Sequence, residues 1–176
     1  SAPSTQALLV AIVATLLQLL WPGRVVFSWD GLMTASVLAQ PQAVSFRELL
    51  FFAHPLVIPL TWPFAHFTDD PLRAAALREA VCSGGVAALC YLGARALSRS
   101  WMAGLVAASG LLLAVGRWQL AASGEEKEIA LLFGGAFYFL YLDHRAVWSL
   151  DLPAFAALSP RFRRVLLGVL LALAMM

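Results

Sequence analysis

The chain has 176 residues, of which 61% are hydrophobic and 12% are charged, with a net charge of +2 and a mean hydropathy of +0.82. Soluble domains carry about 25% charged and about 45–50% apolar residues, so this composition excludes an ordinary soluble domain and predicts an all-α, polytopic helical membrane protein. The small net charge, without a basic cluster interleaved with aromatic residues, predicts no nucleic-acid partner.

The first predicted span covers residues 7–21, which is short for the roughly 20 residues that a membrane helix needs. Trp21 ends the span, where interfacial aromatic residues are common. No positively charged region precedes the span and no small-residue cleavage site follows it. The segment is therefore interpreted as a retained helix rather than a removed signal peptide.

The first loop, residues 22–48, contains Asp30 and a stretch at 31–40 that can form a short helix. Such a helix would either lie in the membrane interface or simply connect two spans. The second apolar segment, residues 49–67, contains three prolines at four-residue spacing: Pro55, Pro59 and Pro63. Because each proline removes a backbone donor and crowds the preceding turn, we expect this segment to be kinked or only partly inserted.

The third predicted membrane helix covers residues 72–97. Arg73, Arg78 and Glu79 fall in its first turns, so its membrane part is placed at 80–96. Small residues in this part are suited to close helix packing.

Three more apolar runs complete the chain, at residues 101–120, 129–142 and 165–176. The last run reaches about 18 Å as a helix, short of a hydrocarbon core of about 30 Å. Residues 1–176 are therefore interpreted as one helical transmembrane module, the N-terminal part of a longer protein. We expect five or six membrane-embedded helices and a functional first loop.

The chemistry of the chain is predicted to reside in two acidic sites and one histidine. Asp30 lies just past the first span, where a carboxylate can bind a divalent cation or accept a proton; the alternative is a solvated loop acid or a helix N-cap. Glu128 belongs to a second acidic patch, for which the alternative is a solvated loop between spans. His54 can bind phosphate, ligate a metal or pigment, or bond to the backbone.

The order of these motifs resembles the N-terminal module of the C-type (GT-C) membrane glycosyltransferases, especially the bacterial relatives of protein O-mannosyltransferases. The matching stretches are Trp29-Asp30-Gly31, then His54-Pro55, then Arg117-Trp118 leading to Glu128-Ile129. The likeness extends over nearly the whole chain, and the order of the motifs is more informative than any one of them.

The resemblance implies an enzyme that transfers a sugar from a polyprenyl-phosphate carrier to an acceptor at the non-cytoplasmic membrane face. Asp30 would be the catalytic carboxylate that activates the acceptor hydroxyl, and a divalent metal ion could bind there. Glu128 would be the second catalytic acid. Arg24, Arg47 or His54 would hold the donor phosphate through charge-assisted hydrogen bonds.

A second interpretation stays open because Leu32, Leu56-Val57 and Ala130 depart from the family's pattern. Under it, the chain is a non-catalytic integral-membrane subunit or scaffold of a larger complex, photosynthetic or respiratory, with membrane lipids and other protein chains as its partners. A histidine would then be available as a pigment or haem ligand.

The expected location is the bacterial inner membrane, and charge predicts the orientation. The loop at 143–164 contains the densest group of arginines and should be cytoplasmic, which places Glu128 outside. If Asp30 shares a site with Glu128, an even number of crossings must separate them. The proline-rich segment 49–67 is then the one that does not cross fully.

Overall fold

The computed structural model of the chain describes residues 2–20, 36–39, 57–114, 127–145, 149–150 and 152–175. Its labelled helices are α1 (Pro3–Leu20), α4 (Val57–Ala65), α5 (Pro71–Ser98), α6 (Trp101–Leu113), α8 (Lys127–His144), α9 (Pro153–Ala156) and α10 (Pro160–Met175). These residues include no strand, so the predicted all-α class is confirmed for the described chain.

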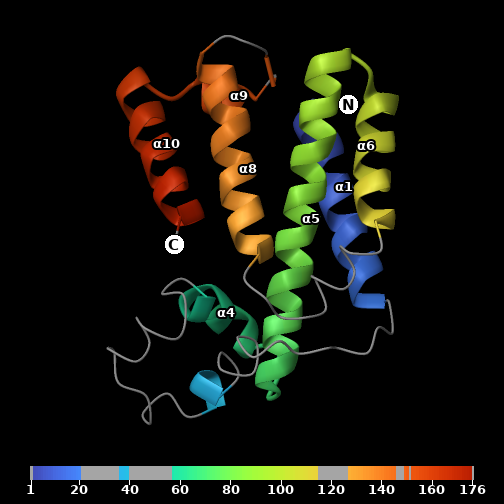
Figure 1. Ribbon diagram of the computed structural model, residues 1–176, viewed down its shortest axis with the longest axis vertical. Helices are drawn as coiled ribbons and strands as arrows, with labels where there is room; N and C mark the ends of the chain where they lie inside the picture. The colour runs from blue at the N-terminus through green and yellow to red at the C-terminus, as the bar shows by residue number, and fades with distance from the viewer. Residues whose placement is uncertain are drawn as a thin grey trace.

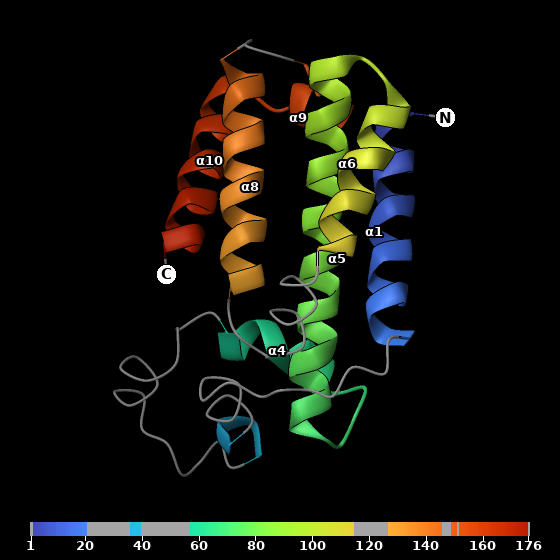
Figure 2. The same ribbon diagram turned by 45° about the vertical axis from the view of Figure 1, so that its right-hand side comes forward.

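Helix α5 is the centre of the bundle (Figure 1). It packs against α1, α4, α6 and α8, whereas α10 packs on the far side of α8. Figure 2 shows the same order after rotation, with α1 and α6 on one side of α5 and α8 and α10 on the other. The short helix α4 runs across one end of α5 instead of along it.

Local capping explains where α5 begins and ends. The Asp70 carboxylate accepts a hydrogen bond from the Leu72 N–H at 2.9 Å, and Pro71 occupies the first turn, where a missing N–H costs nothing. At the other end Arg99 adopts a left-handed conformation (φ 55°), and its N–H bonds to the Arg95 carbonyl.

Two glycines on α5 permit its close approach to neighbouring helices. A Cβ at Gly84 would clash with the Thr15 hydroxyl oxygen and would lie 2.6 Å from the Ala11 carbonyl oxygen of α1. A Cβ at Gly93 would lie 2.5 Å from the Phe139 ring of α8. Small residues at such contacts are characteristic of helix packing in membranes.

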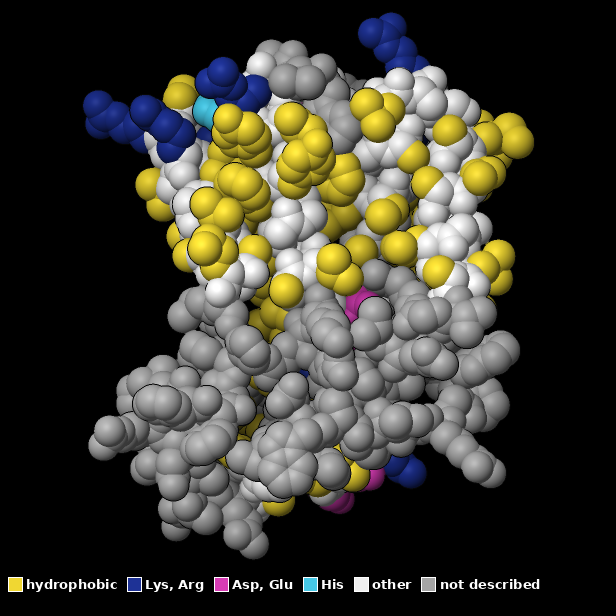
Figure 3. Space-filling view, viewed as in Figure 1, with side chains coloured by type: hydrophobic (Ala, Val, Ile, Leu, Met, Phe, Trp, Pro, Cys, Tyr) yellow, Lys and Arg dark blue, Asp and Glu magenta, His cyan; other side chains and the backbone are white. Residues whose placement is uncertain are grey.

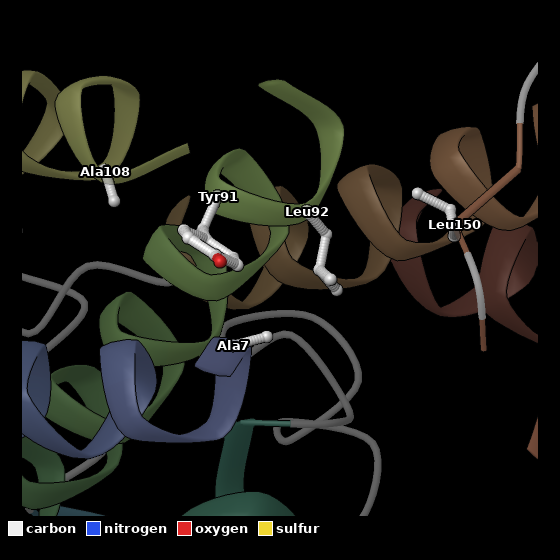
Figure 4. Packing of buried hydrophobic residues seen from close by; sticks show 5 residues of the cluster. All are labelled: Ala7, Tyr91, Leu92, Ala108 and Leu150. Atoms are coloured by element: carbon white, nitrogen blue, oxygen red, sulfur yellow. The ribbon is translucent and has the colours of Figure 1, made fainter. Parts of the chain in front are cut away.

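One apolar core fills the bundle near the C-terminal end of α5. It contains Ala7, Tyr91, Leu92, Ala108 and Leu150. Figure 4 shows Tyr91 between Ala7 of α1 and Ala108 of α6, where the two alanines leave room for the ring. Tyr91 is the largest apolar side chain of this core and is almost fully buried.

The outer surface of the bundle is strongly apolar (Figure 3). Helix α1 alone exposes eight large apolar side chains, each between 44% and 77% exposed: Leu8, Leu9, Ile12, Val13, Leu16, Leu17, Leu19 and Leu20. Soluble monomers rarely expose contiguous apolar patches above a few hundred Å². The surface therefore supports association with a membrane.

The lengths of the described helices support fewer membrane spans than the five or six predicted. Within the described ranges, α1 and α5 are long and apolar enough to cross a membrane, and α6 is a shorter apolar helix. The larger number is therefore not confirmed.

The predicted second segment is only partly described. Its described helix, α4, has nine residues and reaches about 14 Å, less than half of a hydrocarbon core. Pro63 lies inside this helix. Residues 49–56 lie outside the described ranges, and within the predicted short helix at 31–40 only residues 36–39 are described, as helix.

The two ends of the bundle differ in charge. We call the end where α5 finishes and α10 begins the basic end, because six arginines and one acid lie there in the described chain: Arg95, Arg99, Arg145, Arg161, Arg163 and Arg164, with Asp143. Figure 3 shows Lys or Arg side chains (blue) at both corners of the upper edge. Among the side chains that the structure describes, the opposite end, called the α4 end, has two arginines and four acids: Arg73 and Arg78, with Asp69, Asp70, Glu79 and Glu128.

Candidate functional site

The structure describes one of the predicted site residues. Glu128 lies in the first turn of α8, at the α4 end, and is fully buried. Asp30, Arg24, Arg47 and His54 lie outside the described residues, so their predicted roles in catalysis, metal binding and phosphate binding stay predictions. Leu20, the last residue of α1, lies at the α4 end (Figure 1), the end where Glu128 lies.

A buried ion pair lies at the same end. The Arg78 guanidinium donates from Nε and Nη2 to Oε1 of Glu79, at 2.9 and 2.5 Å, and from Nη1 to the Thr61 hydroxyl at 2.8 Å. The Thr61 hydroxyl in turn donates to the Val57 carbonyl at 2.6 Å. All three side chains are at most 1% exposed. Helix α4 thus supplies a neutral acceptor that fixes the guanidinium of α5.

Apolar packing brings α8 to this pair. Val57 of α4, Cys82 of α5 and Ile129 of α8 form one buried cluster. Residues three and four apart share a face of a helix, so Arg78, Glu79 and Cys82 point to the same side of α5. Glu128 directly precedes Ile129, and the charges of Glu79, Arg78 and Glu128 all act on the Cys82 thiol. We call Thr61, Arg78, Glu79 and Glu128 the buried polar cluster.

The other side of α5 at this level is also polar but uncharged. Gln18 of α1 donates to the Ser83 hydroxyl at 2.5 Å, and Thr15 donates to the Ala80 carbonyl at 3.3 Å. These bonds tie α1 to α5 just beside the buried polar cluster. The charged groups therefore sit between α4 and α8, and uncharged groups join α1.

The structure corrects one interpretation of the charged groups and extends another. The sequence places Arg78 and Glu79 in the first turns of the helix, before its membrane part, and the structure shows that protein buries both side chains there. Glu128 is also buried, which contradicts its alternative as a solvated loop acid. Arg73, in contrast, is 80% exposed and pairs loosely with Asp70 at 3.7 Å.

A sequence signal for the buried pair does exist. Arg78 lies at helical spacing from small or apolar residues on both sides, Ala74, Ala75 and Cys82, all buried. Arg73 lies only five residues away. A charged residue that lies on a helix face of small residues is a candidate for burial. At 3.6 residues per turn, Arg73 lies on a different face of α5 from Arg78.

Helix length fixes the depth of the buried polar cluster. Glu79 is 19 residues before Ser98, which corresponds to about 28 Å along α5. Glu128 is 16 residues before His144, or about 24 Å along α8. A hydrocarbon core is about 30 Å thick. If the arginines of the basic end lie at one interface, both glutamates lie near the other.

Two carboxylates and one guanidinium in a buried site are rarely needed for the stability of a fold. Burying charge is costly unless it is paired, and replacing a buried pair by apolar residues is often neutral or stabilising. Ionisable groups that a bundle of apolar helices encloses are therefore candidates for a functional site. Three guanidinium nitrogens of Arg78 are already used within the cluster, so its role is to hold Glu79 and Thr61. The carboxylate of Glu128 is the group suited to proton transfer or cation binding.

A metal site is not formed by the described residues alone. Among them, no group of three or more His, Cys, Asp or Glu side chains is placed to hold a metal ion. The predicted ligand Asp30 lies outside those residues, so a shared cation site remains a prediction.

Comparison with protein-family models, with curated proteins and with solved structures finds no match for this chain.

Proposed function

We propose that the chain is a polytopic membrane module with its basic end in the cytoplasm. Support comes from exposed apolar side chains on helices beyond α1 and α5, among them Val106 of α6, Leu131 of α8 and Val165 of α10. The excess of arginine at one end follows the positive-inside rule. This orientation puts the α4 end, with its buried polar cluster, on the non-cytoplasmic side, and the bacterial inner membrane as the host membrane fits the predicted class.

The proposed activity is sugar transfer from a polyprenyl-phosphate carrier to an acceptor at that face. The observation that carries the proposal is the burial of Glu128 beside the Arg78–Glu79 pair. Glu128 is also the residue that the order of the sequence motifs predicts as the second catalytic acid. Its position at the α4 end, near the boundary of the hydrocarbon, is where a lipid-linked donor and a water-soluble acceptor can meet.

The roles of the site residues follow from their chemistry. Asp30 accepts the proton of the acceptor hydroxyl as the new bond to the sugar forms, and the lipid phosphate leaves. Arg24, Arg47 or His54 stabilises the charge on the phosphate. Glu128 is the second acid, and Arg78 and Thr61 position Glu79 beside it. A divalent cation, where one is bound, would be held by Asp30 and would neutralise the phosphate.

The test is transfer from a labelled polyprenyl-phosphate sugar by the full-length protein in membranes. Asp30→Asn and Glu128→Gln keep side-chain size but cannot accept a proton as a carboxylate does. We expect each to lower the transfer rate by about 10²- to 10⁴-fold, the usual contribution of a general base or acid. Glu125→Gln is the matched control and should change the rate little.

Two outcomes would contradict the proposal. Undiminished turnover in Asp30→Asn, with normal protein in the membrane, would show that this carboxylate is not the base. Wild-type protein without turnover on any lipid-phosphate sugar would favour the second interpretation, a non-catalytic membrane subunit. The unfolding free energy of Glu128→Gln must be measured in parallel, so that loss of activity is not confused with loss of fold.

A further inference from the structure

An apolar groove runs between α1 and α6 on the side of the bundle away from α8. Its volume is about 390 Å³, and its floor is Tyr91 of α5. Helix α1 lines it from Gln6 to Leu17, and α6 lines it from Trp101 to Leu112. The buried polar cluster contributes nothing to it, so the groove is separate from the proposed transfer site.

The length of the groove matches one leaflet of a bilayer. Eleven residue steps along either helix correspond to about 16 Å, and half of a hydrocarbon core is about 15 Å. The groove starts at the basic end, where Gln6 and Trp101 lie, and runs toward the middle of the bundle.

Cationic and polar groups lie at the basic end of the groove. Arg95 donates to Oε1 of Gln6 and, at 3.2 Å, to the Tyr91 hydroxyl, which itself donates to Gln6 at 2.6 Å. Arg99 directly precedes the turn into α6 and is exposed. Among the described residues, no carboxylate forms an ion pair with Arg95 or Arg99. An apolar channel with two arginines at one end is complementary to an anionic lipid.

We propose that the groove between α1 and α6 binds one acyl chain of an anionic phospholipid of the cytoplasmic leaflet, with its phosphate at Arg95 and Arg99. The lipid serves as a structural partner that fills the space between the two helices. This inference rests on the membrane orientation proposed above but not on sugar transfer, and it concerns the opposite leaflet from the donor site. An anionic headgroup near a basic residue is favoured by about five-fold per arginine.

The experiment measures quenching of Trp101 fluorescence in nanodiscs that contain the full-length protein. The probe is phosphatidylglycerol or phosphatidylcholine with an acyl chain brominated near the headgroup, titrated into unlabelled phosphatidylcholine. Trp101→Phe isolates the signal of this one tryptophan by difference. We expect quenching by the brominated anionic lipid to reach half its maximum at about a twenty-five-fold lower mole fraction than quenching by the zwitterionic lipid, from two arginines.

Matched variants separate the tail from the headgroup. Ser109→Leu fills the groove and should abolish the quenching seen at low mole fractions of the brominated anionic lipid. Gly110→Leu, at a neighbouring position with open space around its Cβ, should preserve that quenching. Arg99→Gly removes one charge and also relieves a left-handed backbone position, so it should fold well and lose about five-fold in anionic preference.

Three results would overturn the inference. If both lipids reach half-maximal quenching at the same mole fraction, the groove does not distinguish anionic from zwitterionic lipids. Equal effects of Ser109→Leu and Gly110→Leu would show that the groove does not hold the tail. Trp101 that stays unquenched in a fully brominated bilayer, in protein that still floats with the membrane, would show that protein covers the groove; protein that does not float would instead refute the membrane orientation itself.

Discussion

Replacement of Arg78 by methionine tests whether the buried polar cluster holds the α4 end together. The change removes the two hydrogen bonds to Glu79 and the one to Thr61, while leaving the Glu79 carboxylate buried. Breaking a buried ion pair by removing one partner costs about 3–5 kcal/mol. Since native proteins are stable by about 5–15 kcal/mol, Arg78→Met should lose a large share of the stability.

Arg73→Met is the control for this prediction. Arg73 lies on the same helix, but its side chain is 80% exposed and 3.7 Å from Asp70. Surface ion pairs contribute about 0–1 kcal/mol, so this variant should be close to wild type. The unfolding free energy would be measured by titrating a denaturing detergent into protein in mild detergent micelles, with helix content as the signal.

A double variant shows whether the cost comes from the unpaired carboxylate. Arg78→Met combined with Glu79→Met replaces both charges by apolar groups of similar size. Such replacements are often neutral or stabilising, so the double variant should be more stable than Arg78→Met alone, by about 2 kcal/mol or more. If Arg78→Met lies within about 1 kcal/mol of Arg73→Met, or if the double variant recovers nothing, the description of this cluster as a buried ion pair is wrong.

Three further predictions concern packing and orientation. Gly84→Ala should destabilise the contact of α5 with α1 by about 1–3 kcal/mol through overpacking, measured as above, whereas Gly110→Ala, with no atom within 4 Å of its added Cβ, should be neutral or stabilising. Thr61→Val should cost about 1–3 kcal/mol because the guanidinium loses an acceptor, and Thr61→Ser should restore it. In intact cells, a membrane-impermeant thiol reagent should label Asp70→Cys but not Arg99→Cys; the reverse pattern would invert the proposed orientation.

The boundaries of α5 could be predicted because its signals are local. The predicted helix at 72–97 agrees with Pro71–Ser98 within one residue at each end. Asp70 and Pro71 form an N-terminal cap that depends only on adjacent residues, and helix boundaries with such signals are readable from sequence. The same holds for the turn at Ser100, whose hydroxyl accepts from the Ala103 N–H and starts α6.

The start of α10 lies earlier than its apolar run predicts, for a physical reason. The basic stretch before residue 165 has the composition of a loop, but the helix begins at Pro160. Ser159 caps it by accepting from the Phe162 N–H, and Arg163 bonds to carbonyls of the preceding turn and lies 5.3 Å from the Phe155 ring. Long basic side chains extend from a helix toward an interface, so charge alone does not end a helix.

The site was predictable only in part, since one of its components is local and the other is tertiary. Glu128 could be found because its place in the motif order and at the start of an apolar run is a property of sequence. The burial of Arg78 depends on α4, whose Thr61 supplies an acceptor from 17 residues away. Helical spacing marks Arg78 rather than Arg73 as a candidate for burial, but only the fold shows that α4 covers this face of α5 and supplies the acceptor.

The unequal lengths of the helices explain why the charged groups collect at the α4 end. Helix α5 extends over about 42 Å, whereas α1 and α8 each extend over about 27 Å. Helices α5 and α8 both reach the basic end (Figure 1), so α5 projects about 15 Å beyond α8 at the other end. In the proposed membrane orientation, a charge along the shared length that left the core would meet hydrocarbon, which is costly. Where α5 outruns α8, α4 crosses over it and encloses Arg78 and Glu79 with protein, while α1 still packs on the other side of α5 through Thr15 and Gln18. Glu128 joins the pair at this level because it lies in the first turn of α8.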